Sequence, residues 1–138
     1  MALALGGCDT IDVGPPTGPP MGCNASPSYF VQKIWPEYLV PNDCSKSDCH
    51  DALSGHGYFR LQSVDGVAAP DPTQPPASWP EPWRNNFISA SRLVNCADPE
   101  SSLLLAVPEG RGQPHPAGDV VKDHAAAEAL FREWAKQL

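Results

Sequence analysis

Two cysteines and a histidine stand at fixed spacing near the middle of the chain, in the run Cys44-Ser-Lys-Ser-Asp-Cys49-His50. Each thiol of such a pair can add to a vinyl group of a porphyrin, and the adjacent imidazole is then held where it can ligate the iron. The same residues could close a small Cys44–Cys49 disulfide loop, or supply part of a zinc site. Zinc would need a fourth ligand, and the wide Cys/His pairings of zinc modules are missing downstream. Covalent haem attachment is the favoured interpretation, and the disulfide is its serious competitor.

The surroundings of this motif resemble a known family. Four residues separate Cys44 from Cys49, where two are usual, and this wider form resembles the variant haem-binding motif of some c-type cytochromes. Residues 27–138 resemble a small, class I-like cytochrome c domain of the kind found in bacterial lipoproteins. Besides the motif, the segments that carry the resemblance are Ile34-Trp35-Pro36-Glu37-Tyr38-Leu39, Phe59-Arg60-Leu61, Asp98-Pro99-Glu100-Ser101-Ser102-Leu103-Leu104, Gln113-Pro114-His115-Pro116 and the closing run with Ala127, Leu130 and Trp134.

The resemblance implies one covalently bound haem c. Cys44 and Cys49 would form the thioether bonds, and His50 would be the proximal ligand of the iron. It also implies a mostly α, cytochrome c-like fold with long proline-rich loops, in which the helix before the motif crosses the C-terminal helix. The residues expected at that crossing are Phe30 or Ile34 on the first helix and Leu130 and Trp134 on the last.

The sixth iron ligand cannot follow the usual pattern of this family, which is a distal methionine. The methionines of this chain are Met1 and Met21, and both lie upstream of the motif. His115 is the preferred substitute, because it lies in the long loop before the last helix, where the distal ligand falls in the family. Pro114 and Pro116 flank it, and their fixed φ angles stiffen the backbone there.

Other histidines compete with His115 for this role. His115 could instead be an exposed loop histidine. His124 begins the last helix, where a histidine is more often a surface or first-turn residue than a ligand. His56 follows the motif too closely to reach the distal side. Two imidazole ligands would give a low-potential iron with both axial positions filled. Such a centre favours electron transfer over small-molecule chemistry, so we expect an electron carrier rather than an enzyme.

The N-terminus resembles the end of a secretion signal. The run Met1-Ala-Leu-Ala-Leu-Gly-Gly-Cys8 looks like an apolar segment followed by the lipobox of bacterial lipoproteins, which predicts lipidation of Cys8. It departs from that pattern because it lacks a basic region and is short. We therefore expect that the start codon was assigned too late or that the numbering is trimmed. The alternative is an unstructured N-terminus with a chance cysteine. The predicted organisation is a signal remnant (1–7), a lipidated Pro/Gly spacer (8–22) and a haem domain (23–138), on the periplasmic or cell-surface side of a membrane.

The chain has five cysteines, and this interpretation accounts for each of them. Cys8 takes the lipid and the motif pair takes the haem, which leaves Cys23 and Cys96 as a disulfide pair. That bond would close a long loop and would contribute on the order of 4 kcal/mol in the chain-entropy description. Two disulfides and one odd thiol are the competing arrangement.

Composition excludes some partners. The chain has 138 residues, which suits one domain, and a net charge of −7 without a basic cluster, which disfavours nucleic acid. No apolar run approaches the roughly 20 residues that span a bilayer. The 17 prolines and 11 glycines predict much irregular structure. Residues 66–83 are a proline-rich stretch that we interpret as a surface insertion, anchored by Trp79 and Trp83.

Apolar spacing predicts helices and no convincing strand. Ser26 and Pro27 are typical of an N-cap and a first helical position, and Pro36 predicts a kink or a break soon after. A second helix is expected from Asp98 into the leucines 103–105, and a last one over about 123–138.

Taken together, the sequence predicts one-electron transfer by a membrane-tethered lipoprotein. Its partners would be redox proteins or a larger membrane electron-transfer complex. The alternative is a haem-free accessory or structural subunit of an envelope complex, in which Cys44 and Cys49 form a disulfide. A visible absorption spectrum separates the two hypotheses.

Overall fold

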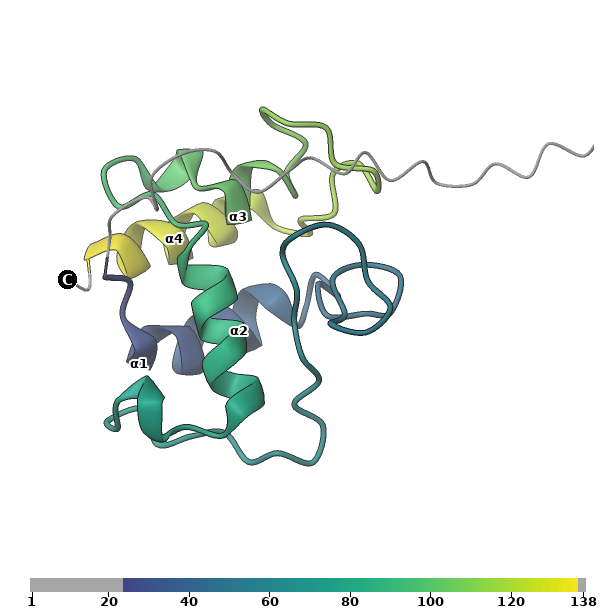
Figure 1. Cartoon of the computed structure of the whole chain (residues 1–138). Helices are drawn as coiled ribbons and strands as arrows, with labels where there is room; N and C mark the ends of the chain where they lie inside the picture. The colour runs from purple at the N-terminus through teal and green to yellow at the C-terminus, as the bar shows by residue number, and fades with distance from the viewer. Residues whose placement is uncertain (1–23, 137–138) are drawn as a thin grey trace, which may run out of the picture.

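The computed structural model describes residues 24–136. Regular structure in this range is helical, apart from one isolated bridge between Asp51 and Leu61. In chain order the elements are α1 (Pro27–Tyr29), the π-helix η1 (Phe30–Leu39), η2 (Pro76–Ser78), α2 (Glu81–Ser91), η3 (Pro99–Ser101), α3 (Leu103–Ala106) and α4 (His124–Lys136) (Figure 1). The prediction of a mostly α chain is confirmed for these residues. None of these helices is long and apolar enough to cross a membrane.

Two helices start where the sequence predicts. Ser26 Oγ accepts a hydrogen bond from Tyr29 N at 3.2 Å, and Pro27 occupies the first helical position of α1. At the start of α4, Asp123 Oδ1 accepts from Ala126 N at 3.0 Å. Both side chains satisfy backbone N–H groups that the first turn of a helix leaves without a partner.

Of the kink or break predicted at Pro36, the break is wrong. The helix continues through this proline to Leu39 as η1, a π-helix in which turns are wider than in an α-helix. At its end Val40 N donates to Trp35 O, five residues back, at 3.0 Å. A proline ring would clash with the preceding turn of an α-helix, and the wider turn leaves room for it.

The expected second helix is interrupted. The residues after Asp98 form the short turn η3, and α3 begins only after Ser102, whose ψ of 129° is extended. Ser102 is fully buried, and its Oγ accepts a hydrogen bond from Asn95 N at 2.9 Å. A tertiary hydrogen bond therefore holds this serine in a conformation that ends one helical turn and starts the next.

Helix α2 was not predicted from the sequence. It begins inside the proline-rich segment 66–83, with Pro80 as the N-cap and Pro82 in the first turn, where a missing N–H is tolerated. The anchoring role expected of the two tryptophans is confirmed, since Trp79 and Trp83 are each only 4% exposed. The ring of Trp83 packs against Trp35 of η1, with the ring centroids 5.2 Å apart.

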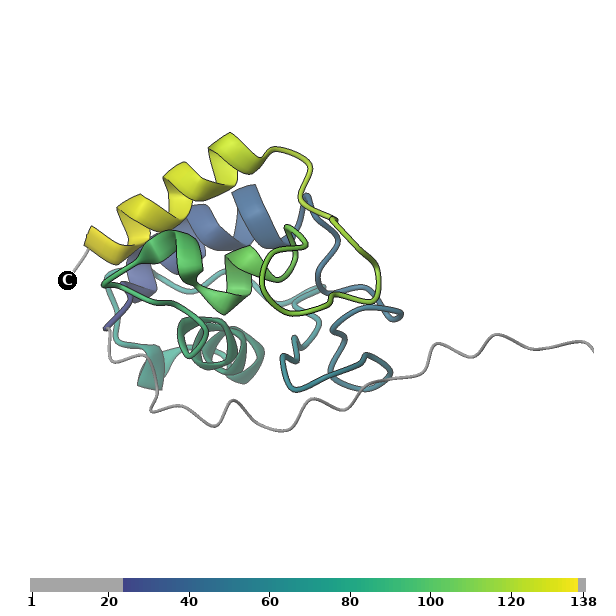
Figure 2. The ribbon, with the colours of Figure 1, turned by 90° about the horizontal axis from the view of Figure 1, so that it is seen from above.

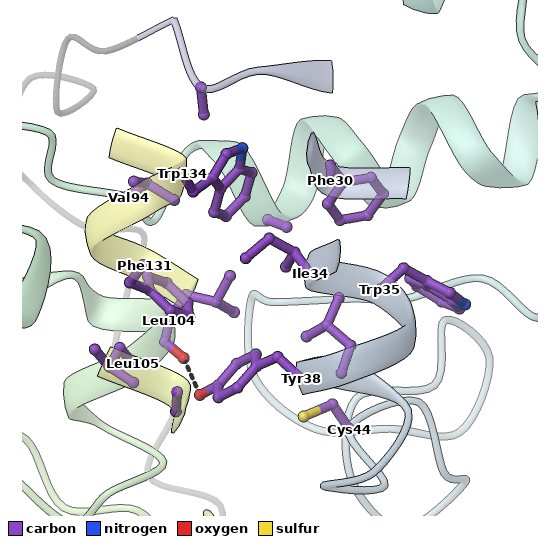
Figure 3. Packing of buried hydrophobic residues seen from close by; sticks show 14 of the residues in the cluster. Phe30, Ile34, Trp35, Tyr38, Cys44, Val94, Leu104, Leu105, Phe131 and Trp134 are labelled. Carbon is purple, nitrogen blue, oxygen red and sulfur yellow. Dashed lines mark hydrogen bonds between the residues drawn. The ribbon is translucent and has the colours of Figure 1, made fainter. Parts of the chain in front are cut away.

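The centre of the core is the packing of η1 against α4, which lie side by side in Figures 1 and 2. Phe30 packs on Trp134 with ring centroids 6.1 Å apart, and Tyr38 packs edge-on against Phe131 at 5.0 Å (Figure 3). The contact expected between the first and last helices is thus confirmed. The aromatic residues of these helices are core residues.

One buried hydrogen bond allows a test of this core. Tyr38 Oη donates to the carbonyl of Leu104 at 2.7 Å (Figure 3). Replacing Tyr38 by Phe leaves that buried carbonyl without its donor, which should lower the free energy of unfolding by about 1–2 kcal/mol. Tyr29→Phe, at a half-buried ring, is the control and should change it by less than about 0.5 kcal/mol. Urea denaturation measures both, and equal losses would contradict the prediction.

Candidate functional site

The Cys/His motif lies in a loop that leaves η1 directly. Cys44 N donates to Leu39 O at 3.1 Å, and the Cys44 side chain is buried at the edge of the core, next to Tyr38 (Figure 3). His50 N in turn donates to Cys44 O at 3.1 Å, so the histidine is tied to the first cysteine through the backbone. Cys49 is half-buried. The end of the helix therefore positions all three motif residues.

The cysteines differ in state. Cys44 and Cys49 are both free, so the Cys44–Cys49 disulfide is not formed in this structure. Burial raises the pKa of Cys44 to about 12, which keeps it a neutral thiol. Cys96 is disulfide-bonded, to a cysteine other than these two. Its predicted partner Cys23, like the predicted lipidation residue Cys8, lies outside the described residues.

His50 is held through one ring nitrogen. Its Nδ1 lies 3.0 Å from Phe59 O and 3.2 Å from His56 O. Because carbonyl oxygens only accept, Nδ1 must be the protonated nitrogen. The ring also packs against the Phe59 ring, with centroids 5.0 Å apart, and burial lowers the pKa of His50, which favours the neutral imidazole. The lone pair then lies on Nε2, the nitrogen that could bind a metal.

The loop around His50 is fastened by its own backbone. Leu61 N donates to His50 O at 2.7 Å, and Ala52 N donates to Leu61 O at 2.8 Å, which forms the isolated bridge. The Asp51 carboxylate accepts from Ser54 N at 2.9 Å, and such hydrogen bonds hold the pKa of Asp51 below its ordinary value. These bonds fix the loop without help from a sheet.

His115 repeats the arrangement of His50 in the loop between α3 and α4. Gly118 N donates to His115 O at 2.8 Å, which closes a tight turn, and Gly118 has a φ of +71° that glycine adopts without strain. His115 Nδ1 lies 2.9 Å from Gly118 O, so Nδ1 is again the donor and Nε2 carries the lone pair.

The structure brings His50 and His115 together, although they are far apart in the sequence. Their ring centroids are 6.2 Å apart, and the ring planes are inclined by 40°. A metal–imidazole bond is roughly 2 Å long and the ring centroid lies about 1 Å behind the nitrogen, so two rings on opposite sides of one metal have centroids about 6 Å apart. At this separation the two rings are close enough that both could bind one metal ion.

One side chain links the bases of the two loops. Asn42, just after η1, accepts a hydrogen bond on Oδ1 from Lys122 N at 3.0 Å, just before α4. Its Nδ2 donates to Tyr38 O at 2.9 Å. In both Figure 1 and Figure 2 the two loops lie on the same side of the helices. Asn42 therefore helps to hold the His50 loop and the His115 loop close together.

The other two histidines lie elsewhere. His56 is exposed, and its contribution to the site is the backbone carbonyl that accepts from His50. His124 is exposed at the start of α4 and pairs with Asp119, and this hydrogen bond raises the pKa of His124. Sequence reasoning missed the carbonyls of Phe59 and Gly118, because every residue carries a carbonyl and nothing in the residue type marks the one that is used.

A zinc site finds no support among residues 24–136, where no three His, Cys, Asp or Glu side chains are grouped so as to hold a metal ion. A structural zinc ion takes about four protein ligands. A haem iron differs because the porphyrin supplies four nitrogens, which leaves two axial positions for the chain. His50 and His115 are two imidazoles that lie close together, and Cys49 directly precedes His50 in the motif.

No match to the chain is found among protein-family models, curated proteins or solved structures. The functional argument therefore depends on the geometry of the two histidine loops and on the motif chemistry.

Gly55 is required by the loop that holds His50. A Cβ built at Gly55 would lie 2.5 Å from both the N and the O of Asp51. Gly55→Ala should therefore displace the loop and lower the free energy of unfolding by about 3 kcal/mol, as expected for overpacking.

The control for this prediction is Gly57→Ala. Gly57 has a φ of +76° with nothing within 4 Å of a Cβ, so the substitution should cost about 1 kcal/mol of backbone strain. Chemical denaturation measures both variants. A Gly55→Ala loss no larger than that of Gly57→Ala would show that the close approach is relieved without movement of the loop.

Proposed function

We propose that this chain is a c-type cytochrome that carries one covalent haem and transfers single electrons. In this proposal Cys44 and Cys49 hold the haem through thioether bonds, His50 is the proximal ligand and His115 is the distal ligand. The observation that carries the proposal is the 6.2 Å separation of the two imidazole centroids, together with the backbone carbonyls that hold both Nδ1 atoms.

The hydrogen bonds on Nδ1 support this assignment. Metal-ligating histidines commonly donate their other N–H to a carbonyl or carboxylate, which fixes the tautomer and the direction of the ring. Both histidines of this pair meet that condition through neighbouring backbone. Because both rings are already held in one orientation, binding a cofactor through Nε2 would cost little side-chain entropy.

The state of the motif cysteines also supports it. Thioether formation consumes two reduced thiols, and Cys44 and Cys49 are both free. The backbone N–H of His50 donates a hydrogen bond to Cys44 O, and His50 directly follows Cys49. All three groups therefore lie on one short segment. A cofactor held by both thiols would therefore keep its iron beside His50.

The ligand set favours electron transfer over catalysis. When bound, the haem supplies a one-electron Fe(III)/Fe(II) couple. His50 and His115 would both hold the iron through Nε2, and two imidazole ligands from the chain favour electron transfer over binding of a substrate. Imidazole in place of a distal methionine lowers the reduction potential. These residues would thus serve a low-potential electron carrier.

Under this proposal the domain works outside the cytoplasm, tethered by a lipid on Cys8. The Pro/Gly-rich residues 8–22 would form a spacer between the membrane and the haem domain. Its partners would be redox proteins, or the neighbouring subunits of a larger membrane complex, on the periplasmic or cell-surface side. A net charge of −7 favours partners with a basic docking surface.

The alternative is a haem-free accessory subunit of an envelope complex. That alternative includes a Cys44–Cys49 disulfide, whereas both thiols are free. It also assigns no role to the pairing of His50 with His115. No observation in the described residues favours it over the cytochrome.

Covalent haem is directly testable. The protein, produced with haem-maturation machinery, should show a sharp Soret band, and its haem should stay with the chain through acid–acetone extraction. The double variant Cys44→Ser/Cys49→Ser should release its haem in that extraction, because both thioether bonds are gone. A colourless wild-type protein would contradict the proposal.

The distal ligand is tested by His115→Ala. This variant should keep its haem, because the thioether bonds and His50 are untouched. Its iron should become high-spin and bind carbon monoxide when reduced, as seen in absorption spectra. His56→Ala is the matched control, since that ring is exposed, and it should stay low-spin. An unchanged low-spin spectrum in His115→Ala would move the distal ligand to another residue.

A further inference from the structure

Three titratable side chains meet where the loop that carries His115 begins and ends. Glu109 follows α3, Asp119 comes late in the loop, and His124 is the first residue of α4. His124 Nε2 lies 2.8 Å from Asp119 Oδ2, and His124 Nδ1 lies 3.9 Å from Glu109 Oε1. The imidazole therefore stands between two carboxylates that bracket the His115 turn.

Glu109 has an incomplete set of partners. Its side chain is fully buried. Arg111 pairs with Oε2, and the Arg111 Nε donates to that oxygen at 2.8 Å. Oε1 is a buried oxygen with no hydrogen-bond partner, and His124 Nδ1 faces it. An unpaired carboxylate oxygen in the interior is costly, so a donor on His124 Nδ1 would relieve it.

The protonation state of His124 decides whether the carboxylates of Asp119 and Glu109 can both accept a hydrogen bond from its ring. A neutral imidazole has one N–H, whereas the imidazolium has two. Only the imidazolium can donate from Nε2 to Asp119 and, after a small rotation, from Nδ1 to Glu109. With a neutral ring the lone pair of one ring nitrogen would face a carboxylate oxygen.

We propose that His124 is a positioning residue, whose doubly protonated imidazole bridges Asp119 and the buried carboxylate of Glu109 and so holds the His115 turn opposite His50. The inference rests on the proposed function, because it assigns a role to the loop that presents the distal ligand.

The bridge reaches His115 through adjacent residues. Asp119 directly follows Gly118, whose carbonyl accepts from His115 Nδ1 and whose N–H donates to His115 O. Asp119 Oδ1 also accepts from Val121 N at 3.1 Å, which stiffens the segment between the turn and α4. Releasing Asp119 from His124 would therefore free the turn that aims the His115 ring.

The charges around His124 set the direction of the pH dependence. The hydrogen bond to Asp119 raises the pKa of His124, and the carboxylates of Glu109 and Glu128 add to the effect. Arg111 pairs with Glu109, and Arg132 Nη1 lies 3.8 Å from Glu128 Oε2. These two cations partly offset the effect of the Glu109 and Glu128 carboxylates on the pKa of His124. Because the folded-state pKa is raised, the bridge is complete below the ordinary pKa of histidine. It is lost as the pH rises through the raised value.

The experiment compares the haem-bearing wild type with His124→Gln, and with His56→Gln as the control. Glutamine keeps a polar side chain of similar reach but cannot carry the charge. Two readouts are followed from acid to alkaline pH: the exchange protection of the Gly118 amide and the rate of carbon monoxide binding to the reduced protein. In the wild type and in His56→Gln, protection should fall and the binding rate should rise several-fold as the pH passes the His124 titration. His124→Gln should show the weakly protected, fast-binding behaviour at every pH.

Each other outcome has a definite meaning. Protection of Gly118 in His124→Gln that equals the wild type at every pH would overturn the inference. So would a wild-type protection step without a matching change in carbon monoxide binding, because the bridge would then not position the ligand. If the protein carries no haem, the proposed function fails on its own, and the exchange measurement on the same variants still decides whether His124 holds the turn.

Discussion

Helices η1 and α4 pack their aromatic side chains into one layer, and the placement of both histidine loops follows from that contact. Phe30 meets Trp134 at one end and Tyr38 meets Phe131 at the other, and each such pair adds about 0.5–1.5 kcal/mol beyond the area that it buries. The motif loop leaves the C-terminal end of η1, and the His115 loop enters the N-terminal end of α4. When these two helix ends are held together, their loops must share one side of the molecule.

Beyond that layer, the site is built from turns and single hydrogen bonds rather than from regular structure. Backbone carbonyls of Phe59 and Gly118 orient the two imidazoles, and Asn42 links the loop bases. Local bonds of this kind leave the loops easier to open than the helices. A cofactor bound to His50 and to His115 would cross-link them and stabilise the folded state by mass action. A small domain is the kind that gains most from such a cross-link.

Several elements could be predicted because their signals are local. Ser26 caps the first helix, and the apolar spacing of α4 marks a helix with one buried face. Elements decided by distant contacts were missed or misjudged. The prolines at the start of α2 obscured a helix whose Trp83 and Ala90 face the core. The break at Ser102 depends on a hydrogen bond to Asn95 that no local pattern announces.

The sequence by itself determined the reactive groups of the motif, because Cys44, Cys49 and His50 are neighbours in the chain and their spacing defines their chemistry. It also directed attention to His115, through the absence of methionine downstream of the motif. Only the tertiary structure decided that the His115 ring lies 6.2 Å from the His50 ring, and that backbone carbonyls hold both rings by Nδ1. That pairing depends on helix packing and loop closure between residues far apart in the chain, and neither residue type nor spacing encodes such a distance.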